Sequence, residues 1–326
     1  MMHHATHTGP TRRDVLAMIG GGVAALSCPS FVHAKAADAA ARRAAARKNL
    51  PLGVFGDVYA SFPLEEAARR IKADGFSCVV FDYRFKDVAF DCWNPDWDVL
   101  KKMVSALEKN DIRVVGLHGY YNVIDPDAER RKRGEQRMEL LIKHWQRFGS
   151  PVISTATGSF DPESEFAEHP KNFTEDGYRA VRDAFTRLAR AAEKTKAVIA
   201  IEPYWKNVIA SVDRTERLFK DVDSPSLKLT MDPCNYFHNE ELPKMAPMLN
   251  DIFKRVGSQT AIAHAKDVKA TAEGGQDLPA AGLGVLDYPL YLRLLAGLDR
   301  EMPLVVEHLQ LADVARARDY TKAQMD

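Results

Sequence analysis

Short apolar runs recur at fairly even intervals from residue 52 to residue 307, and a stretch with helical spacing follows each run. Runs of four to seven mainly apolar residues bounded by polar ones predict buried strands. Eight such runs are present, so the chain is expected to alternate strands with helices. The expected strands are Leu52–Gly56, Phe76–Asp82, Ile112–His118, Pro151–Thr157, Val198–Glu202, Leu227–Asp232, Ala261–His264 and Leu304–Glu307.

Amphipathic stretches lie between these runs, with apolar residues spaced three and four positions apart. Eight alternating units favour a closed parallel (β/α)8 TIM barrel, an α/β fold formed as a single domain over residues 51–326. An open doubly wound sheet is the rival architecture, but no GxGxxG follows the first run. The expected helices include Leu64–Ala73, Trp97–Lys109, Asp127–Phe148, Gly177–Lys194, Asp213–Phe219 and Tyr288–Leu298.

Four of the expected strands, all in the C-terminal half, end on a residue that can bind a metal. A charged or imidazole group at the end of a buried strand is unfavourable unless a partner compensates it. Taken singly, such residues are ordinarily salt-bridge partners or hydrogen-bonded core histidines, but four together favour one shared divalent cation. Mn²⁺ is the expected ion, with Mg²⁺, Co²⁺ and Zn²⁺ as alternatives. The expected ligands are Glu202, Asp232, His264 and Glu307.

Charge and composition narrow the range of partners. The formal net charge is zero, with 45 basic and 45 acidic residues, so the chain lacks the basic character of a nucleic-acid-binding protein. Hydrophobic residues make up 46% and charged residues 28%, as in ordinary globular proteins. Beyond the N-terminal segment, Cys78, Cys92 and Cys234 form an odd set without CxxC spacing, and a Cys78–Cys92 disulfide stays open as an alternative.

The N-terminal segment has the features of an export signal. Arg12 and Arg13 precede a Gly- and Ala-rich apolar stretch at residues 17–26, and Ala34-Lys35-Ala36 offers a small-residue cleavage site. We therefore expect residues 1–36 to be a twin-arginine signal peptide that directs the protein to the periplasm, and residues 37–50 to be a linker. The apolar stretch is too short to span a bilayer, so stable membrane insertion is not expected.

Three local motifs resemble those of the xylose isomerase-like barrel superfamily, specifically its sugar phosphate isomerase/epimerase branch. Ile201-Glu202-Pro203 resembles its fifth-strand glutamate motif, and His264-Ala265-Lys266-Asp267 its seventh-strand His-x-Lys-Asp. Gly282-Leu283-Gly284-Val285-Leu286-Asp287 resembles the Gly-x-Gly segment before the seventh helix. The similarity extends from Leu52 to about Leu309.

The resemblance implies that Glu202, Asp232, His264 and Glu307 hold a single divalent cation. It also implies that Glu202 and Glu307 lie on opposite faces of a bound sugar and exchange protons with it through a metal-stabilised enediolate. Barrels of this family commonly pair through exposed helices and rim loops, so a homo-oligomer is a further expectation.

Four more residues are expected to bind substrate: His118, Trp205, Asn235 and Lys266. Their alternatives are structural, namely a core histidine for His118, rim packing for Trp205 and an ion pair with Asp267 for Lys266. Asn235 stands where ketose 3-epimerases of this barrel usually carry histidine. Tyr204 replaces the lysine of the Glu-x-Lys motif of true xylose isomerases, so that activity is disfavoured.

Together these features predict an exported, divalent-metal-dependent sugar isomerase or epimerase with Glu202 and Glu307 as acid and base. No GxxxxGK[ST] motif or arginine cluster for phosphate is visible, so the expected substrate is an unphosphorylated carbohydrate. A metal-dependent lyase or dehydratase acting on 3-keto-glycosides is the alternative, because it shares the first proton abstraction. A non-catalytic carbohydrate-binding barrel is the third hypothesis.

Overall fold

The computed structural model describes residues 48–272 and 275–325. The predicted signal peptide lies outside the described residues, as does the predicted linker up to residue 47. Within the described part, Leu50 is already buried and lies two residues before the first strand.

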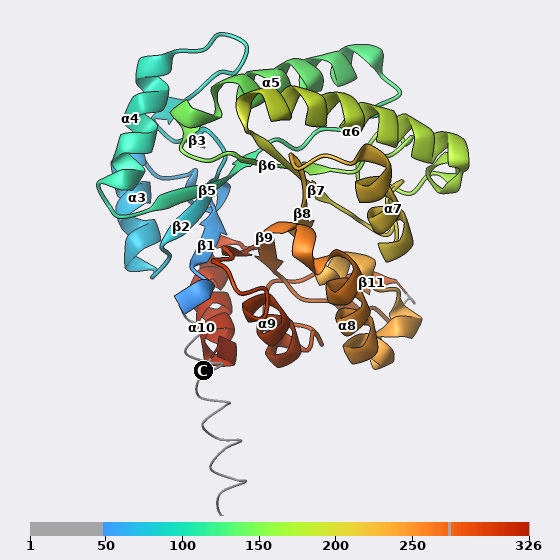
Figure 1. The fold of residues 1–326 in the computed structure, drawn as a ribbon. Coiled ribbons are helices and arrows are strands. Elements are labelled where there is room, and N and C mark those ends of the chain that lie inside the picture. The colour runs from blue at the N-terminus through green and yellow to red at the C-terminus, as the bar shows by residue number, and fades with distance from the viewer. Residues whose placement is uncertain (1–47, 273–274, 326) are drawn as a thin grey trace, which may run out of the picture. The chain divides into compact units, whose positions relative to one another are not determined.

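Eight parallel strands close into a barrel (Figure 1) in the order β1-β12-β9-β8-β7-β6-β5-β2. Typical registers pair Val54 with Val79 and Thr155 with Ile201. The predicted α/β barrel is therefore confirmed, and the eight apolar runs are its eight strands. Their bounds are β1 Leu52–Phe55, β2 Cys78–Phe81, β5 Arg113–His118, β6 Val152–Ala156, β7 Val198–Glu202, β8 Leu227–Met231, β9 Thr260–Ala265 and β12 Leu304–Val306.

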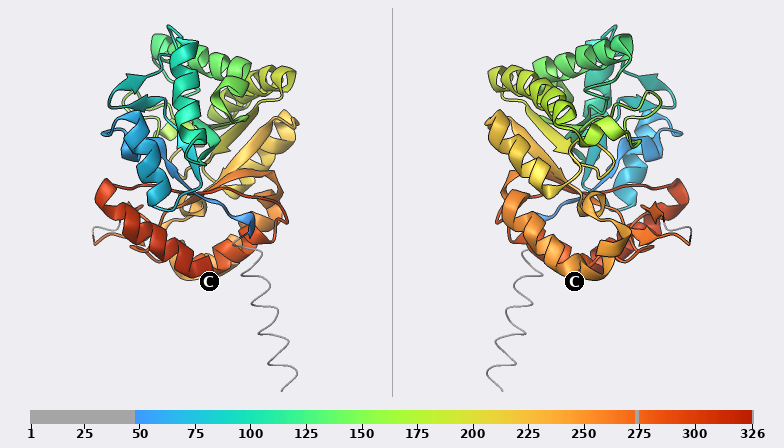
Figure 2. Two further views of the ribbon diagram at one scale, coloured as in Figure 1. Left: turned by 90° about the vertical axis from the view of Figure 1, so that its left-hand side faces the viewer. Right: turned by 90° about the vertical axis from the view of Figure 1, so that its right-hand side faces the viewer.

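Helices form the outer layer around the strands, as two side views show (Figure 2). The α-helices are α3 Leu64–Ala73, α4 Trp97–Glu108, α5 Ala128–Phe148, α6 Glu175–Thr195, α7 Val212–Val222, α8 Met245–Val256, α9 Tyr288–Ala296 and α10 Val314–Met325. The 3₁₀ helices are η1 Gly56–Tyr59, η2 Pro170–Phe173, η3 Pro233–Tyr236, η4 Asn239–Lys244, η5 Gly257–Gln259 and η6 Leu311–Asp313. Two hairpins pair β3 Arg84–Phe85 with β4 Val88–Ala89, and β10 Lys269–Ala270 with β11 Gln276–Asp277.

Helix starts follow from local sequence, because a short polar side chain precedes most of the long helices. Asp96, Asp127, Thr174, Ser211 and Asp287 each accept a hydrogen bond from a backbone N–H of the helix that follows. Such caps satisfy donors that the first helical turn leaves unpaired. The helices therefore begin at fixed points after each strand, which fixes the loops at the carboxyl edge of the barrel.

Two apolar layers hold the barrel together: one inside the ring of strands and one between strands and helices. The inner layer is narrow at Gly116 of β5, where an added Cβ would lie 3.1 Å from Ile262 and 3.3 Å from Val80. A glycine there leaves room for the aliphatic side chains of Ile262 in β9 and Val80 in the neighbouring strand β2. The inner layer contains Cys78, Val80, Val115, Ala200, Ile262 and Val305.

Cysteines and hydropathy settle two further points. Cys78, Cys92 and Cys234 are buried and free, so the Cys78–Cys92 disulfide left open by the sequence does not form. Cys78 belongs to the inner apolar layer of the barrel, whereas Cys92 belongs to the other apolar layer, so the two thiols are in separate layers. Among the described residues, no helix has both the length and the apolar character needed to cross a bilayer.

Candidate active site

The four predicted ligands converge at the carboxyl edge of the barrel. Glu202 is the last residue of β7, and Asp232 directly follows β8. His264 lies in β9, and Glu307 directly follows β12. One ligand atom from each residue lies within 4.8 Å of those of the others, and all four side chains are buried. The strands therefore bring together a set that can surround one ion.

The chemistry of this cluster suits a divalent cation. His264 is fully buried, and its Nδ1 atom, 3.0 Å from Glu307 Oε2, makes no well-aligned hydrogen bond within the described part of the chain. Buried polar atoms ordinarily have a hydrogen-bond partner, so an unpaired imidazole nitrogen beside three carboxylates fits a metal ligand. Oxygen donors with one imidazole are compatible with Mn²⁺, Mg²⁺, Co²⁺ and Zn²⁺.

Lys266 places an ammonium group inside the same cluster. Its Nζ atom contacts Asp232 and lies 2.9 Å from Glu307 Oε1 and 3.9 Å from Glu202 Oε1. Burial alone would lower the pKa of Lys266, but the three carboxylates raise it well above its usual value. The ammonium of Lys266 and one divalent cation would together carry three positive charges, which equals the negative charge of the three carboxylates. The cluster would therefore be electrically neutral with a doubly charged ion bound.

The alternative ion pair between Lys266 and Asp267 is not formed. Asp267 instead accepts hydrogen bonds from the backbone N–H groups of Val268, Gly282 and Leu286, at 3.0, 3.0 and 2.9 Å. Successive residues of a strand point to opposite faces, which sends Lys266 into the barrel mouth and Asp267 away from it. Asp267 thus holds the segment that carries the Gly-x-Gly motif.

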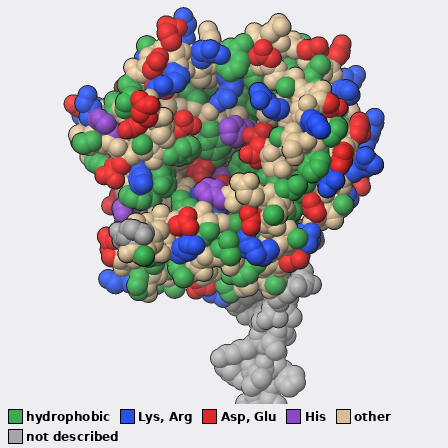
Figure 3. Space-filling model, turned by 180° about the vertical axis from the view of Figure 1, so that it is seen from behind, with side chains coloured by type: hydrophobic (Ala, Val, Ile, Leu, Met, Phe, Trp, Pro, Cys, Tyr) green, Lys and Arg blue, Asp and Glu red, His purple; other side chains and the backbone are tan. Residues whose placement is uncertain are grey.

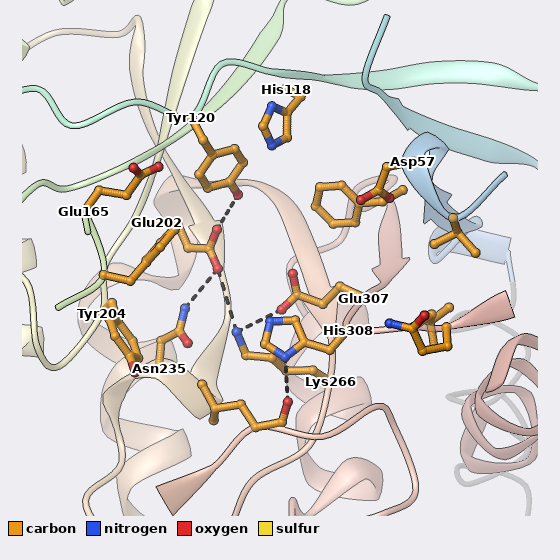
Figure 4. A pocket seen from close by; sticks show the side chains of 16 residues that line it. Asp57, His118, Tyr120, Glu165, Glu202, Tyr204, Asn235, Lys266, Glu307 and His308 are labelled. Atoms are coloured by element: carbon orange, nitrogen blue, oxygen red, sulfur yellow. Dashed lines mark hydrogen bonds and ion pairs between the residues drawn. The ribbon is translucent and has the colours of Figure 1, made fainter. Parts of the chain in front are cut away.

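The two buried glutamates, Glu202 and Glu307, differ in the side chains that contact their carboxylates (Figure 4). Tyr120 donates a short hydrogen bond to Glu202 Oε2, and Asn235 Nδ2 donates to Oε1 at 2.9 Å. Glu307 instead has the ammonium of Lys266 beside it, with Nζ 2.9 Å from Oε1, and His264 Nδ1 lies 3.0 Å from Oε2. His264 Nδ1 also lies 3.5 Å from Glu202 Oε1, a longer contact. Glu307 is therefore the carboxylate with the stronger cationic surroundings.

The pKa values follow these surroundings. Burial alone would raise the pKa of Glu307, yet His264 and Lys266 hold it well below its usual range. The same forces lower the pKa of Glu202, against burial, mainly through His264. Burial would lower the pKa of His264, but Glu307 and Glu202 raise it to about 10. Glu202 and Glu307 are therefore both carboxylates at neutral pH.

A cavity of about 740 Å³ opens above the cluster, and Figure 3 shows histidine and acidic side chains gathered around this hollow. His118, Asn235 and Lys266, three of the four predicted substrate-binding residues, line it. The Oδ1 atom of Asn235 is buried without a hydrogen-bond partner, so it is free to accept one from a ligand hydroxyl. The lining consists of Phe55, Asp57, Val58, His118, Tyr120, Glu165, Phe166, Glu202, Tyr204, Asn235, Lys266, Leu278, Glu307, His308, Leu309 and Gln310.

Trp205 is not among the residues that line this cavity. Its ring packs against Tyr204 and His238, with centroid distances of 5.8 and 5.0 Å. The adjacent Tyr204 lines the cavity instead. Trp205 therefore packs at the rim, as its structural alternative described. Tyr204, one position earlier, is the aromatic residue after β7 that faces the cavity.

His118 lies on the opposite side of the cavity from Lys266, beside Tyr120 (Figure 4). Its Nδ1 atom is 3.8 Å from Asp82 Oδ1, and burial lowers its pKa to about 4. Burial and the nearby Asp57 raise the pKa of Asp82 to about 8. At neutral pH this pair is therefore an uncharged imidazole beside a largely protonated carboxyl.

Sequence reasoning missed several lining residues, notably Tyr120, Glu165 and Phe166. Tyr120 carries a usable signal, because it lies two residues beyond His118 at the polar end of the expected third strand. Glu165 and Phe166 lie in a long loop without periodicity, so nothing local distinguishes them from surface residues. Their role depends on how the loop folds.

Comparisons with known proteins bear on the fold and the family of the chain. No curated protein sequence matches the chain. Among solved structures, the apo form of 3-keto-D-glucoside 4-epimerase from E. coli is 19% identical, with a TM-score of 0.60, over 84% of this chain and 99% of that one. A xylose isomerase-like TIM barrel protein from Mycobacterium smegmatis in complex with magnesium is 15% identical, with a TM-score of 0.62, over 85% and 96%.

A third similar structure is the probable 3-DHS dehydratase from Bacillus anthracis, 13% identical, with a TM-score of 0.62, over 85% of this chain and 97% of that one. At these identities the likeness concerns the fold. The sequence model of the family described as xylose isomerase-like TIM barrel matches residues 65–324, which include all eight strands but the first. The chain therefore belongs to the xylose isomerase-like TIM barrel family.

Proposed function

We propose that this protein is a divalent-metal-dependent isomerase or epimerase that moves a proton next to the carbonyl group of an unphosphorylated sugar. The observation that carries the proposal is the convergence of two buried glutamates with Asp232 and His264 at the base of an open cavity. Similar structures include proteins named 3-keto-D-glucoside 4-epimerase and L-ribulose 3-epimerase. These names support the reaction class and leave the sugar open.

Glu202, Asp232, His264 and Glu307 would hold the cation, for which Mn²⁺ is our first expectation. A divalent ion, when bound there, supplies Lewis-acid stabilisation of negative charge on a substrate oxygen while a neighbouring C–H bond breaks. Lys266 and Asn235 lie beside the same cluster and would position the oxygens of the substrate. The lining aromatic side chains would restrict water, which strengthens every charge interaction in the site.

We assign the first proton abstraction to Glu202. Its oxygens are held by the neutral donors Tyr120 and Asn235, whereas the oxygens of Glu307 face His264 and Lys266. Lys266 is an ammonium 2.9 Å from Glu307 but 3.9 Å from Glu202, and a carboxylate beside an ammonium has a lower proton affinity and is a weaker base. Glu307 would then return a proton to the other face of the same carbon for epimerisation, or one glutamate would deliver it to the neighbouring carbon for isomerisation.

Charge on the cavity wall supports an unphosphorylated substrate. The lining contains four carboxylates, those of Asp57, Glu165, Glu202 and Glu307, and within it the one lysine or arginine among the described residues is Lys266. That ammonium is already engaged by Asp232 and Glu307. Asp57 and Glu165 would therefore repel a phosphate group, and the lining offers it no unpaired lysine or arginine among the described residues.

The proposal is tested by two measurements on purified mature protein. Metal analysis should find about one divalent ion per chain. In D₂O with Mn²⁺, NMR should detect deuterium entering a ketose or 3-keto-glycoside at the carbon next to its carbonyl. Glu202→Gln should lower the exchange about a thousandfold, whereas the exposed Glu168→Gln, which lies outside the cavity lining, should retain it. Sugar binding without exchange in the wild type would favour the non-catalytic barrel instead.

A lyase or dehydratase is the second candidate, and the size of the cavity favours it. About 740 Å³ is within the range of about 300–1,000 Å³ that holds drug-sized ligands, so a sugar carrying a leaving group fits. Elimination would begin with the same abstraction by Glu202. Mass spectrometry separates the candidates, because elimination releases the leaving group, whereas epimerisation conserves the mass of the substrate.

We also propose that residues 1–36 direct the protein to the periplasm through the twin-arginine pathway. The arginine pair, the short apolar stretch and the Ala34-Lys35-Ala36 site support this proposal. Replacing Arg12 and Arg13 with lysine should retain the full-length precursor in the cytoplasmic fraction. Unchanged fractionation of the double variant would contradict it.

A further inference from the structure

The loop between β6 and α6 is held unusually firmly for a surface segment. Asn122 Nδ2 donates to the backbone oxygen of Ser159 at 2.7 Å, and Asn172 Nδ2 donates to the hydroxyl of Ser159 at 2.9 Å. Asn207 Nδ2 donates to the backbone oxygen of Glu165 at 2.7 Å. All three asparagines are buried. Buried amides fixed in this way position a loop before any ligand arrives.

This fixed loop presents Glu165 and Phe166 to the cavity. Phe166 is 44% exposed and meets Tyr204 edge to face, with ring centroids 6.2 Å apart. Figure 4 shows Glu165 on the Tyr120 and Tyr204 side of the cavity, opposite Asp57. An aromatic face beside a carboxylate is a combination that binds the C–H surface and the hydroxyl groups of a sugar ring.

A second hollow of about 230 Å³ adjoins the main cavity and shares two lining residues with it, Tyr120 and Glu165. Tyr120 is also the donor to Glu202, so the second hollow begins one side chain away from the metal ligands. The hollow is mostly polar. Its lining consists of Tyr120, Tyr121, Asn122, Asp125, Arg130, Asp161, Glu163, Ser164 and Glu165.

We propose that the two hollows are adjacent sugar subsites and that the substrate is a keto-glycoside of at least two sugar rings. The reacting ring lies over the four predicted ligands, and the second ring passes Glu165 against Phe166 into the second hollow. Only the place of the reacting ring rests on the proposed function. The second subsite rests on the loop, the exposed aromatic ring and the shared lining.

The lining decides between a sugar and other second groups. A hydrocarbon group would remove water from the charged carboxylates that line the second hollow, which is unfavourable. An anionic group would face Asp125, Asp161 and Glu163, and the guanidinium of Arg130 is already paired with Asp125 at 2.6 and 2.7 Å. A neutral group rich in hydroxyls satisfies both conditions.

Calorimetry on the Mn²⁺-loaded protein tests the inference with two matched pairs of probes. D-fructose is compared with lactulose, a ketose disaccharide, and methyl 3-keto-β-glucoside is compared with 3-keto-cellobiose. We expect the disaccharide of at least one pair to bind about tenfold more tightly than its one-ring partner. NMR saturation transfer should then reach the protons of the second ring. Equal affinities within both pairs would overturn the inference.

Two variants of similar exposure locate the effect. Phe166→Ala should reduce the disaccharide preference to less than about threefold, because it removes the aromatic face in the main cavity that the second ring passes on its way into the second hollow. Phe173→Ala is the control, since Phe173 is 46% exposed, follows in the same loop and lines neither hollow. It should keep the full preference. An equal loss in both variants, or no loss in Phe166→Ala, would contradict the assignment.

The two levels of the proposal fail differently. A disaccharide preference without deuterium exchange would remove the proposed reaction and leave the second subsite standing. Deuterium exchange into D-fructose or methyl 3-keto-β-glucoside, with no gain for either disaccharide, would remove the second subsite and leave the reaction standing. Melting temperatures of the variants establish that each is folded before affinities are compared.

Discussion

Glu202 and Glu307 lie at the ends of β7 and β12, which β8 and β9 separate in the barrel, and both carboxylates reach the same cluster. Tyr120 and Asn235, both neutral, hold Glu202, whereas His264 and Lys266 surround Glu307. Residue type and burial are the same at the two positions, so the difference comes from the donors alone. Two glutamates at the same edge of a barrel can therefore have unequal proton affinities when their neighbouring side chains differ.

The largest effect should come from removing each glutamate in turn. Glu202→Gln should lower deuterium exchange by about a thousandfold, because an amide cannot accept the proton. Glu307→Gln, measured at saturating Mn²⁺, should retain exchange but lose the epimerised product. NMR of both variants in D₂O gives the comparison, with Glu168→Gln as the control. Equal loss of exchange in both would show that the donors do not set the order of proton transfer.

Lys266→Met tests the cationic side of the comparison. Removing an ammonium from beside the cluster removes its repulsion of a second cation, so Mn²⁺ should bind about a hundredfold more tightly. Competition with a chelator of known affinity measures this change without turnover. Weaker Mn²⁺ binding in Lys266→Met would mean that Lys266 mainly orients the carboxylates.

Tyr120→Phe tests the neutral side and should lower deuterium exchange about tenfold, because Glu202 loses the hydroxyl that holds its Oε2 atom in position. The metal content should stay unchanged. Tyr178→Phe is a matched control, since its hydroxyl also donates to a carboxylate, Asp221, but between α6 and α7 outside the cavity. Loss of bound metal in Tyr120→Phe alone would assign Tyr120 to metal binding rather than to the base.

A third carboxyl, that of Asp82, extends the comparison. The neutral imidazole of His118 lies beside it, and the pKa of Asp82 is raised to about 8, mainly by burial. In the unfolded chain the pKa is near 3.8, so the folded state holds an extra proton between these values and stability falls as pH rises through 8. His118, with its folded pKa lowered to about 4, acts oppositely but only below about pH 6.5.

Between pH 7 and pH 8 the wild type should therefore lose about 1 kcal/mol from Asp82. Asp82→Asn should remove this loss, because the amide does not titrate. Chemical unfolding at both pH values measures the difference between the two proteins. Parallel slopes for wild type and variant would show that Asp82 is already ionised at neutral pH.

Much of the fold follows from local sequence. Each buried strand needs apolar residues, and the four predicted ligands stand out because polar groups at such positions are unfavourable alone. The approximate strand positions were predicted correctly, although β2 spans Cys78–Phe81 rather than Phe76–Asp82. The helices predicted from the sequence did not include α8, which has Pro243 just before it and Pro247 in its first turn. Prolines are compatible with helix starts, so these two residues do not prevent a helix from forming there.

The donors around each glutamate could not be read from the chain, because they depend on contacts between distant strands. Tyr120 is 82 residues from Glu202, and Asn235 is 33 residues away. From the sequence alone, Lys266 could equally pair with its neighbour Asp267. In the structure the two side chains point in opposite directions, so they form separate contacts. Loop residues such as Phe166 acquire a role only through buried asparagines far apart in sequence.

The order of strands around the barrel has a consequence for how the protein matures. β12 pairs with β9 on one side and with β1 on the other, so it is the strand that closes the ring, and Glu307 directly follows it. Before closure, a nascent chain can offer only three of the four predicted ligands. Capture of an ion by all four residues would thus coincide with completion of the barrel, and firm retention of metal would distinguish finished molecules from unfinished ones.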